Sequence, residues 1–402
     1  MSPHNDKSID PPSVLEHDLN KHFPELLTFG STKDLHASSL WKDISSEAER
    51  VLNAVVGENL SEATVGADCR MVRALAWNIE RGNVYDGIID GLKNHDGLKD
   101  KDLLLLTELD HGMARSGNRF VAQGIARELK LNYVFAPVYV ALQKGSGVES
   151  QVVGENQLSI HGLAMFSRYP MANVHAVPLP NGKDKMWGKE KRLGSLRALF
   201  ADIDHPAGKF RAVTIHLDAH CSRAHRQMQI KIVLDHLDTL PPLPVIIGGD
   251  WNTTTFNSQN STRAILGYWR RVLMGPKNVA KNHLPNPERY FERNLFSMLE
   301  KRGYNYRSLN EVGAGTLHYH IESIEKNTNL RDWVPEWCFP FIFWAAGRVG
   351  GHVSARLDWF AGKGIEIAPG AKPQTIGGLV DHKGTPLSDH DAIGIDFRII
   401  SS

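Results

Sequence analysis

The sequence has little cysteine, almost no net charge and no long apolar run, and each absence excludes a class of protein. Its three cysteines, Cys69, Cys221 and Cys338, are widely spaced and form no Cys-x-x-Cys pair, so neither a disulfide framework nor a cysteine-rich zinc module is expected. Lysine and arginine number 46 against 45 acidic residues, which leaves no global positive charge for nucleic-acid binding. No apolar stretch reaches the roughly 18 residues that a membrane-spanning helix needs.

The N-terminal stretch MSPHNDKSIDPP is polar and has no apolar signal core. Together with the odd number of cysteines, this pattern predicts a cytoplasmic protein with reduced thiols. Apolar residues make up 42% of the 402 residues and charged residues 23%, which is the composition of an ordinary globular protein with a large core. The 19 histidines direct attention to metal binding and proton transfer.

The chain divides into an N-terminal helical part and a longer part with short strands. Residues 1–68 contain two helix-like stretches, and we expect an N-terminal helical extension there. In residues 69–400, apolar strands alternate with helical segments, and several strands are apolar at nearly every position, as in sheets covered on both faces. This alternation predicts an α/β fold with helices outside the sheets. The predicted strands are 72–80, 102–110, 132–141, 161–168, 196–204, 211–218, 244–252, 355–363 and 392–399.

A long insertion, at about residues 256–350, is expected between the strand ending near Asn252 and the strand that holds Asp358. Its first part is helix-like, and its second part is rich in Trp, Phe and Gly. We interpret the aromatic stretch DWVPEWCFPFIFWAAG as the core of an inserted subdomain, in preference to an apolar lip that touches lipid.

Polar residues recur at the ends of the predicted strands. The stretch VIIGGDWN (245–252) ends on Asp250 and Asn252, where packing alone favours apolar side chains. A single Asp or Asn at a strand end is most often a turn former or a cap, but the pattern occurs at six places, and a lone carboxylate inside a strand is costly unless paired. The other five carry Asn78 and Glu80, Glu108 and Asp110, His216 and Asp218, Asp358, and Asp389 and His390.

These residues combine carboxylate and amide oxygens with two imidazoles. Hard oxygen ligands favour Mg²⁺, which leaves room for a substrate phosphate, and imidazoles suit proton transfer or donation to an oxyanion. No cysteine cluster or close histidine pair supports a structural zinc site.

Taken in this order, the motifs resemble the endonuclease/exonuclease/phosphatase superfamily. The resemblance spans about residues 71–400, apart from the insertion. It implies a four-layered α/β sandwich, with two mixed β-sheets face to face and helices outside. The matching motifs are WNIERG (77–82), Thr107-Glu108, His216-Leu217, GDWN (249–252) and SDH (388–390), with ARSGNR (114–119), HGLAMFSRYP (161–170) and the helix start Ser222, Arg226 and Gln229.

By this resemblance, one group of residues would bind a metal ion and the substrate. Glu108 would be the principal Mg²⁺ ligand with Asn78 beside it, and Mn²⁺ could substitute. Glu80 and Asp389 would lie near the metal, the latter through water. The residues expected to bind the substrate are Asn78, Asn252, Arg81 and Arg119, since arginine forks suit phosphate oxygens.

A second group would carry the chemistry. Asp250 would orient or deprotonate the attacking water, and Asn252 would fix that carboxylate. Asp358 would accept a hydrogen bond from His390 and so set its tautomer. His390 and His216 would contact the phosphate as it reacts. The partner of His216 stays open between His161, Glu155 and none, because the motif around residue 161 departs from that of the relatives.

The implied function is Mg²⁺-dependent hydrolysis of a phosphodiester by in-line attack of an activated water, most simply as a nuclease. The alternatives are a lipid or small-molecule phosphoesterase and an inactive binding module on the same fold. Nucleic acid is favoured over lipid as the partner, and no protein partner is inferred.

Overall fold

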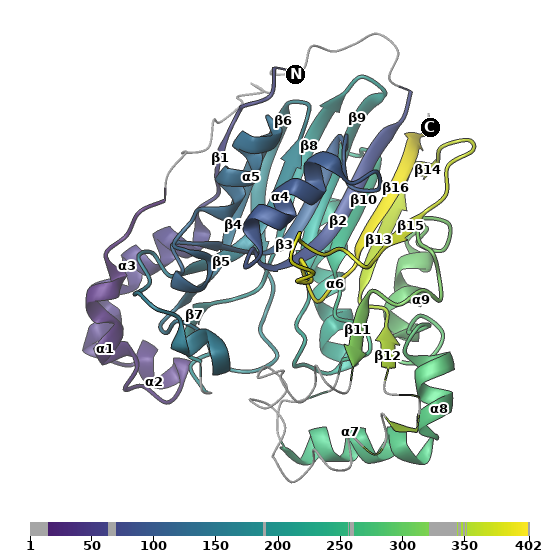
Figure 1. Cartoon of the computed structure of the whole chain (residues 1–402). Coiled ribbons are helices and arrows are strands. Elements are labelled where there is room, and N and C mark those ends of the chain that lie inside the picture. Colours follow the sequence, from purple (N-terminus) through teal and green to yellow (C-terminus); the bar gives the residue numbers. More distant parts are fainter. Residues whose placement is uncertain are drawn as a thin grey trace.

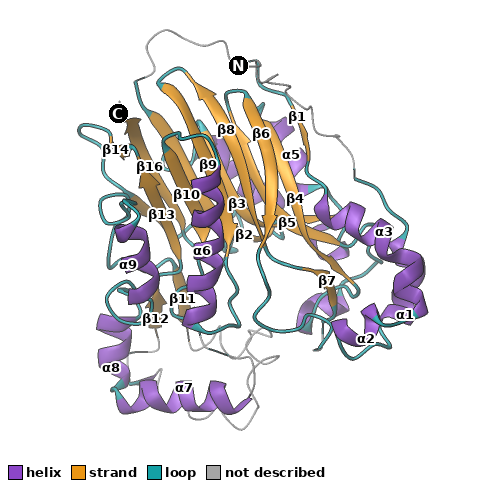
Figure 2. Cartoon of the chain, turned by 180° about the vertical axis from the view of Figure 1, so that it is seen from behind, coloured by secondary structure: helices purple, strands orange, loops and turns teal. Residues whose placement is uncertain are grey.

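In the computed structural model, two β-sheets lie face to face and helices cover both outer sides (Figures 1 and 2). The structure describes residues 15–62, 70–187, 190–255, 257, 261–320, 344, 347–348, 350 and 352–400. The four layers confirm the α/β sandwich that the sequence predicts.

The larger sheet contains nine of the described strands and is mixed, since β2 and β3 run parallel and the other pairs are antiparallel. Its order is β1 (Val56–Glu58), β4 (Asn132–Ala141), β5 (Ile160–Ser167), β3 (Leu103–His111), β2 (Val72–Arg81), β16 (Ala392–Ile399) and β14 (Ile365–Ile367), with β15 (Gln374–Ile376) on β16 and β7 (Arg192–Gly194) on β4.

The smaller sheet is also mixed. Its strands β10 and β9 are parallel, and the remaining pairs are antiparallel. The order is β13 (Asp358–Lys363), β10 (Val245–Asp250), β9 (Gly208–His216), β8 (Arg197–His205) and β6 (Met171–Pro178).

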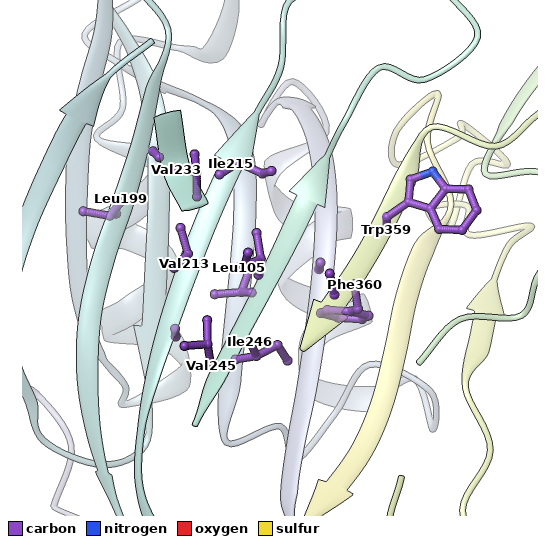
Figure 3. Packing of buried hydrophobic residues seen from close by; sticks show 14 of the residues in the cluster. Leu105, Leu199, Val213, Ile215, Val233, Val245, Ile246, Trp359 and Phe360 are labelled. Atoms are coloured by element: carbon purple, nitrogen blue, oxygen red, sulfur yellow. The ribbon is translucent and has the colours of Figure 1, made fainter. Parts of the chain in front are cut away.

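Apolar residues on alternate positions of one strand enter different cores, because side chains of a strand point to opposite faces. In β3, Leu103 and Leu105 belong to the core between the sheets, whereas Leu104 and Leu106 belong to the core under the helices that cover the larger sheet. Figure 3 shows Leu105 among Val213 and other residues of the smaller sheet. This explains why four consecutive positions of the strand, Leu103 to Leu106, are all apolar.

Different helices cover the two outer faces. On the larger sheet lie α3 (Ser39–Asn53), α4 (Tyr85–Asn94) and α5 (Val121–Leu129); on the smaller sheet lie α6 (Arg223–Thr239) and α9 (Arg293–Lys301). The Ser38 hydroxyl caps α3 by accepting from Trp41 N, and Ser222 caps α6 by accepting from His225 N, which fixes where each helix begins.

The described part of the segment before residue 69 packs on the larger sheet. Besides α3 it forms the 3-10 turn Leu19–His22 and the short helices α1 (Phe23–Leu26) and α2 (Thr32–His36), and its strand β1 pairs with β4. Its apolar residues share the core of the larger sheet. The domain boundary after residue 68 stays a prediction.

The predicted insertion contains both helices and a small hairpin. Its elements are α7 (Ser261–Leu273), α8 (Pro276–Asn278), the π-helical turn Val279–His283, α9 and strand β11 (Leu317–His320), which pairs with β12 (His352–Ala355). The aromatic stretch 332–347 lies almost wholly outside the described residues. None of the described helices combines the length and the apolar character that crossing a membrane requires.

Candidate active site

Asn78 points into the space between the sheets because of its position in β2. It lies on the same face of β2 as Ala74 and Ala76, which point toward the smaller sheet, while Leu75 and Trp77 on the opposite face point toward the helices. The Asn78 amide donates to Glu108 Oε1 and to Asp250 Oδ2, at 3.1 Å in both cases. One buried amide therefore joins the two sheets at their strand ends.

Irregular backbone turns the neighbouring acids toward the same place. Regular alternation would put Glu108 on the helix side with Leu104 and Leu106, but the register shifts between Thr107 and Leu109, and Glu108 has a φ of 57°. Glu80 and Arg81 also have positive φ values, where β2 is irregular against β3. Bulges and left-handed backbone at non-glycine residues concentrate at functional sites, where they re-aim side chains.

Three polar residues of the smaller sheet lie side by side across its strands. Asp250 on β10 is in register with His216 on β9 and with Asp358 on β13. Gly249, with a φ of 135°, makes this alignment possible, because a Cβ there would lie 2.1 Å from the carbonyl oxygen of Ile215. A Cβ on Gly248 would meet Leu105 of the facing sheet at 2.7 Å. The two glycines thus allow the strands and the sheets to approach closely.

Asp250 is at the centre of the arrangement, and its side chain is buried. Asn252 donates to it through its backbone N at 2.8 Å and through Nδ2 at 3.2 Å, in addition to the bond from Asn78. The Nε2 atoms of His216 and His390 lie 3.5 Å and 3.8 Å from Asp250 Oδ2. This geometry holds a carboxylate among donors and two imidazoles, as the orientation of a water molecule requires.

His390 and Asp358 form a buried pair. His390 Nδ1 lies 2.8 Å from Asp358 Oδ2, which fixes the ring and leaves Nε2 directed toward Asp250. Burial lowers the pKa of His390, but the carboxylates of Asp358, Asp250 and Asp389 outweigh it and raise this pKa well above its ordinary value. The imidazole is therefore disposed to carry a proton and to donate it.

Three carboxylates offer oxygen ligands on the other side of Asn78. Burial, together with the charges of Asp389 and Glu108, raises the pKa of Glu80 to about 7, and Asp389 N donates to Glu80 Oε2 at 3.2 Å. Burial opposes ionisation of Glu108, but the charge of Arg81 keeps its pKa below the usual range. A hard divalent cation would relieve the repulsion among these oxygens, so the donor set fits Mg²⁺.

Two other groups of side chains have potential ligand atoms close together. Among the described residues, two sets of side chains have ligand atoms within 4.8 Å of one another: Asp250, Asp358 and His390, and Asp218, Cys221 and His225. In the first set His390 already pairs with Asp358. In the second, burial raises the pKa of Cys221 to about 12, which disfavours the thiolate that a metal needs. The carboxylates of Glu80, Glu108 and Asp389 are therefore the better candidate for the metal site.

The two arginines expected to bind substrate occupy different places. Arg81 lies beside Glu108 and pairs with Glu149, with Nη1 3.0 Å from Oε1. Arg119 instead lies over the Tyr85 ring at the start of α4, 5.1 Å from its centroid, and is exposed. It makes no ion pair with the site carboxylates in the part of the chain that the structure describes.

His161 and Glu155, the two residues considered as partners of His216, interact with other side chains. His161 Nδ1 lies 2.8 Å from Asp110 Oδ1, and Glu155 pairs with Lys144 at the surface. Asp110 in turn accepts two hydrogen bonds from Arg115, at 2.8 Å and 3.0 Å. The Asp110–His161 pair and Arg115 lie next to Glu108, and the sequence alone assigns no role to this group. Asp110 is nevertheless one of the polar residues at strand ends, and Arg115 and His161 lie in the motifs ARSGNR and HGLAMFSRYP.

Comparisons with known proteins give the family of this sequence. The family model described as the Endonuclease/Exonuclease/phosphatase family matches residues 75–390. No curated protein matches the sequence.

Three similar solved structures align with most of this chain at low sequence identity. An endonuclease/exonuclease/phosphatase from Beutenbergia cavernae DSM 12333 is 16% identical with a TM-score of 0.48, covering 83% of this chain and 72% of its own. D. rerio TDP2 complexed with single strand DNA product is 15% identical with a TM-score of 0.45, covering 82% and 100%. The human Nocturnin catalytic domain with bound sulfate anion is 14% identical with a TM-score of 0.42, covering 87% and 98%.

Proposed function

This chain belongs to the endonuclease/exonuclease/phosphatase family, and from that premise we propose that it hydrolyses phosphodiesters with Mg²⁺ as its cofactor, most simply as a nuclease. One observation carries the proposal. Polar residues from both sheets meet around Asp250, which Asn78 and Asn252 hold by hydrogen bonds and which His216 and His390 face.

In the proposed reaction, Asp250 orients the attacking water and takes up its proton. Asn252 fixes the Asp250 carboxylate, and Asn78 links it to Glu108. His390, protonated and held by Asp358, donates a hydrogen bond to a phosphate oxygen while the ester bond from phosphorus to the leaving oxygen breaks, and the leaving oxygen takes up a proton from solvent. His216, on the other side of Asp250, contributes a second donor as charge develops on those oxygens.

The metal would be held by Glu108 together with Asn78, Glu80 and Asp389. When bound, Mg²⁺ supplies charge neutralisation at the phosphate. Arg81 would add a guanidinium on the same side. Arg119, over Tyr85, would reach only a part of the substrate that extends toward α4.

A substrate panel tests the proposal. The full chain is assayed with Mg²⁺, with Mn²⁺ and with excess chelator on bis(p-nitrophenyl) phosphate, plasmid DNA, RNA and sphingomyelin. We expect cleavage of nucleic acid that the chelator abolishes. Cleavage of sphingomyelin alone would overturn the nuclease assignment, and no cleavage with any divalent ion would favour an inactive binding module.

The variant Asp250→Asn tests the assignment of the base. It preserves the shape of the side chain and the bond to Asn252 N, and we expect a loss of about 10³-fold in turnover. A wild-type rate in this variant would contradict the role given to Asp250.

A further inference from the structure

A carboxylate bridges two guanidinium groups beside the candidate active site. Glu149 Oε1 lies 3.0 Å from Arg81 Nη1, and Glu149 Oε2 lies 3.0 Å from Arg115 Nη1. All three side chains are largely buried, with 13%, 2% and 12% of Arg81, Arg115 and Glu149 exposed. An anion whose separate oxygens are held by two guanidinium groups has the contacts that arginine offers to phosphate.

Arg115 does not depend on Glu149 for its position. Its Nε and Nη2 atoms donate to the two oxygens of Asp110, so Nη1 is the part of the fork that faces Glu149, with Glu190 Oε1 further away at 3.8 Å. Arg81 forms an ion pair with Glu149, and the charges of Glu108 and Glu80 also stabilise its guanidinium. A buried guanidinium requires a counter-charge, so an anion that replaced Glu149 would be favoured at Arg81.

Glu149 stands on a short turn whose backbone hydrogen bonds are local. It belongs to the 3-10 turn Gly147–Gln151, preceded by Gly145, and both glycines have positive φ values. The backbone bonds of Glu149 are local, to Ser146 and Val152. Replacing its two ion pairs would therefore break little of the surrounding structure, and glycines permit the backbone to change conformation.

The pair of arginines adjoins the reacting centre. Arg81 follows Asn78 by three residues at the irregular end of β2 and is in register with Leu109, next to Glu108. We propose that Arg81 and Arg115 form a subsite for a second phosphate of the substrate, next to the scissile one, and that Glu149 occupies this subsite until the substrate displaces it. This inference rests on the proposed phosphodiesterase function and narrows its substrate to a molecule with two neighbouring phosphates.

The subsite selects among phosphodiesters by charge. A polynucleotide carries a phosphate at every step, and a terminally phosphorylated nucleotide carries a phosphate beside its first diester, so both satisfy two guanidiniums. A phospholipid with a choline headgroup places a cation near the same diester, and the two guanidinium groups repel that cation.

The variant Glu149→Gln tests the subsite, because it removes the competing charge and retains the side-chain shape. We compare the dinucleotide TpT, which has one phosphate, with pTpT and TpTpT, which have more. The variant is expected to raise kcat/KM about tenfold for pTpT, for TpTpT or for both, through a lower KM, and to leave TpT within twofold. A gain for pTpT alone identifies a terminal phosphate, and a gain for TpTpT identifies a phosphate within the chain.

Glu155→Gln is the matched control. Glu155 lies six residues further along the same segment, its side chain is 85% exposed, and it pairs with Lys144, so the charge change is the same but lies outside the subsite. We expect no effect on any of the three substrates. Adding Arg81→Gln to Glu149→Gln should cancel the gain; a gain that persisted would overturn the assignment of Arg81.

A binding measurement separates the subsite from turnover. Calorimetric titration of the full chain with inorganic pyrophosphate in the presence of chelator should give about tenfold tighter binding for Glu149→Gln than for wild type and for Glu155→Gln. Unchanged pyrophosphate binding, with equal losses of activity on all substrates and a lower melting temperature, would identify Glu149 as a structural brace and overturn the inference. Absence of all cleavage would instead overturn the proposed function, while the titration would still decide the subsite.

Discussion

The imidazole of His390 and the carboxylate of Asp358 lie 2.8 Å apart, although 32 residues separate them in the sequence. His390 comes from the loop before β16 of the larger sheet, whereas Asp358 begins β13 of the smaller sheet. The pair therefore spans the two sheets at the same edge as the bond between Asn78 and Asp250. Chemistry at this edge depends on how the sheets are packed.

The variant Asp358→Asn should lower kcat by about 10- to 100-fold, because an amide no longer favours the imidazolium of His390 or fixes its tautomer. The pKa of His390 should fall, so activity should decline at a lower pH than in the wild type as the pH rises. A pH profile of kcat measures this effect. The matched control is Asp204→Asn, an exposed aspartate of β8, and equal losses in both variants would contradict the role of Asp358.

The variant Glu108→Gln should raise the Mg²⁺ concentration needed for half-maximal activity by about 10- to 100-fold, because an amide is a weaker ligand for a hard cation. Titration of activity with Mg²⁺ after chelator treatment measures the shift. Glu366→Gln, which alters a partly exposed carboxylate paired with Arg398, is the control. An unchanged metal requirement in Glu108→Gln would place the metal elsewhere.

The stability of the protein should decrease between pH 6.5 and pH 4 because of His111. Burial lowers the pKa of His111 to about 4, against the opposing effect of its hydrogen bond to the Leu15 carbonyl. Below pH 6.5 the unfolded chain binds a proton that the folded protein does not, so the stabilisation present above pH 6.5 is lost as the pH falls toward 4.

In His111→Gln this proton is absent. Between pH 7.5 and pH 5 the wild type should lose about 2 kcal/mol more of its free energy of unfolding than the variant does. Urea unfolding at both pH values measures the difference. The same loss in both proteins would show that His111 does not carry the effect, and His382→Gln, at an exposed position, controls for removal of a histidine.

The variant Arg226→Met should destabilise the fold by about 3–5 kcal/mol, because it leaves the carboxylate of Glu292 buried without its partner. Arg226 Nε lies 3.0 Å from Glu292 Oε1, and both side chains are inaccessible to solvent. The double variant Arg226→Met, Glu292→Gln removes the uncompensated charge and should regain part of the loss in urea unfolding. A single variant as stable as wild type would contradict the assignment of this pair as structural.

Much of the fold class could be predicted from the sequence because its signals are local. Strands such as β4 are apolar at nearly every position, and this pattern is read from consecutive residues. The polar residues of the site were likewise found as interruptions of that pattern, among them Asn78, Glu108 and Asp250. Their metal-binding and catalytic roles stay predictions.

Only the tertiary structure decided which side chains pair with one another and in which direction some of them point. Regular alternation would turn Glu108 toward the helices, and only the bulge in β3 directs it between the sheets. The Arg226–Glu292 pair joins residues 66 positions apart, and Arg81 meets Glu149 from a segment with no recognisable motif. A local pattern specifies which residues are polar and, where a strand is regular, which face of the strand they occupy. It does not specify which strands and loops become neighbours, because that depends on the packing of the two sheets.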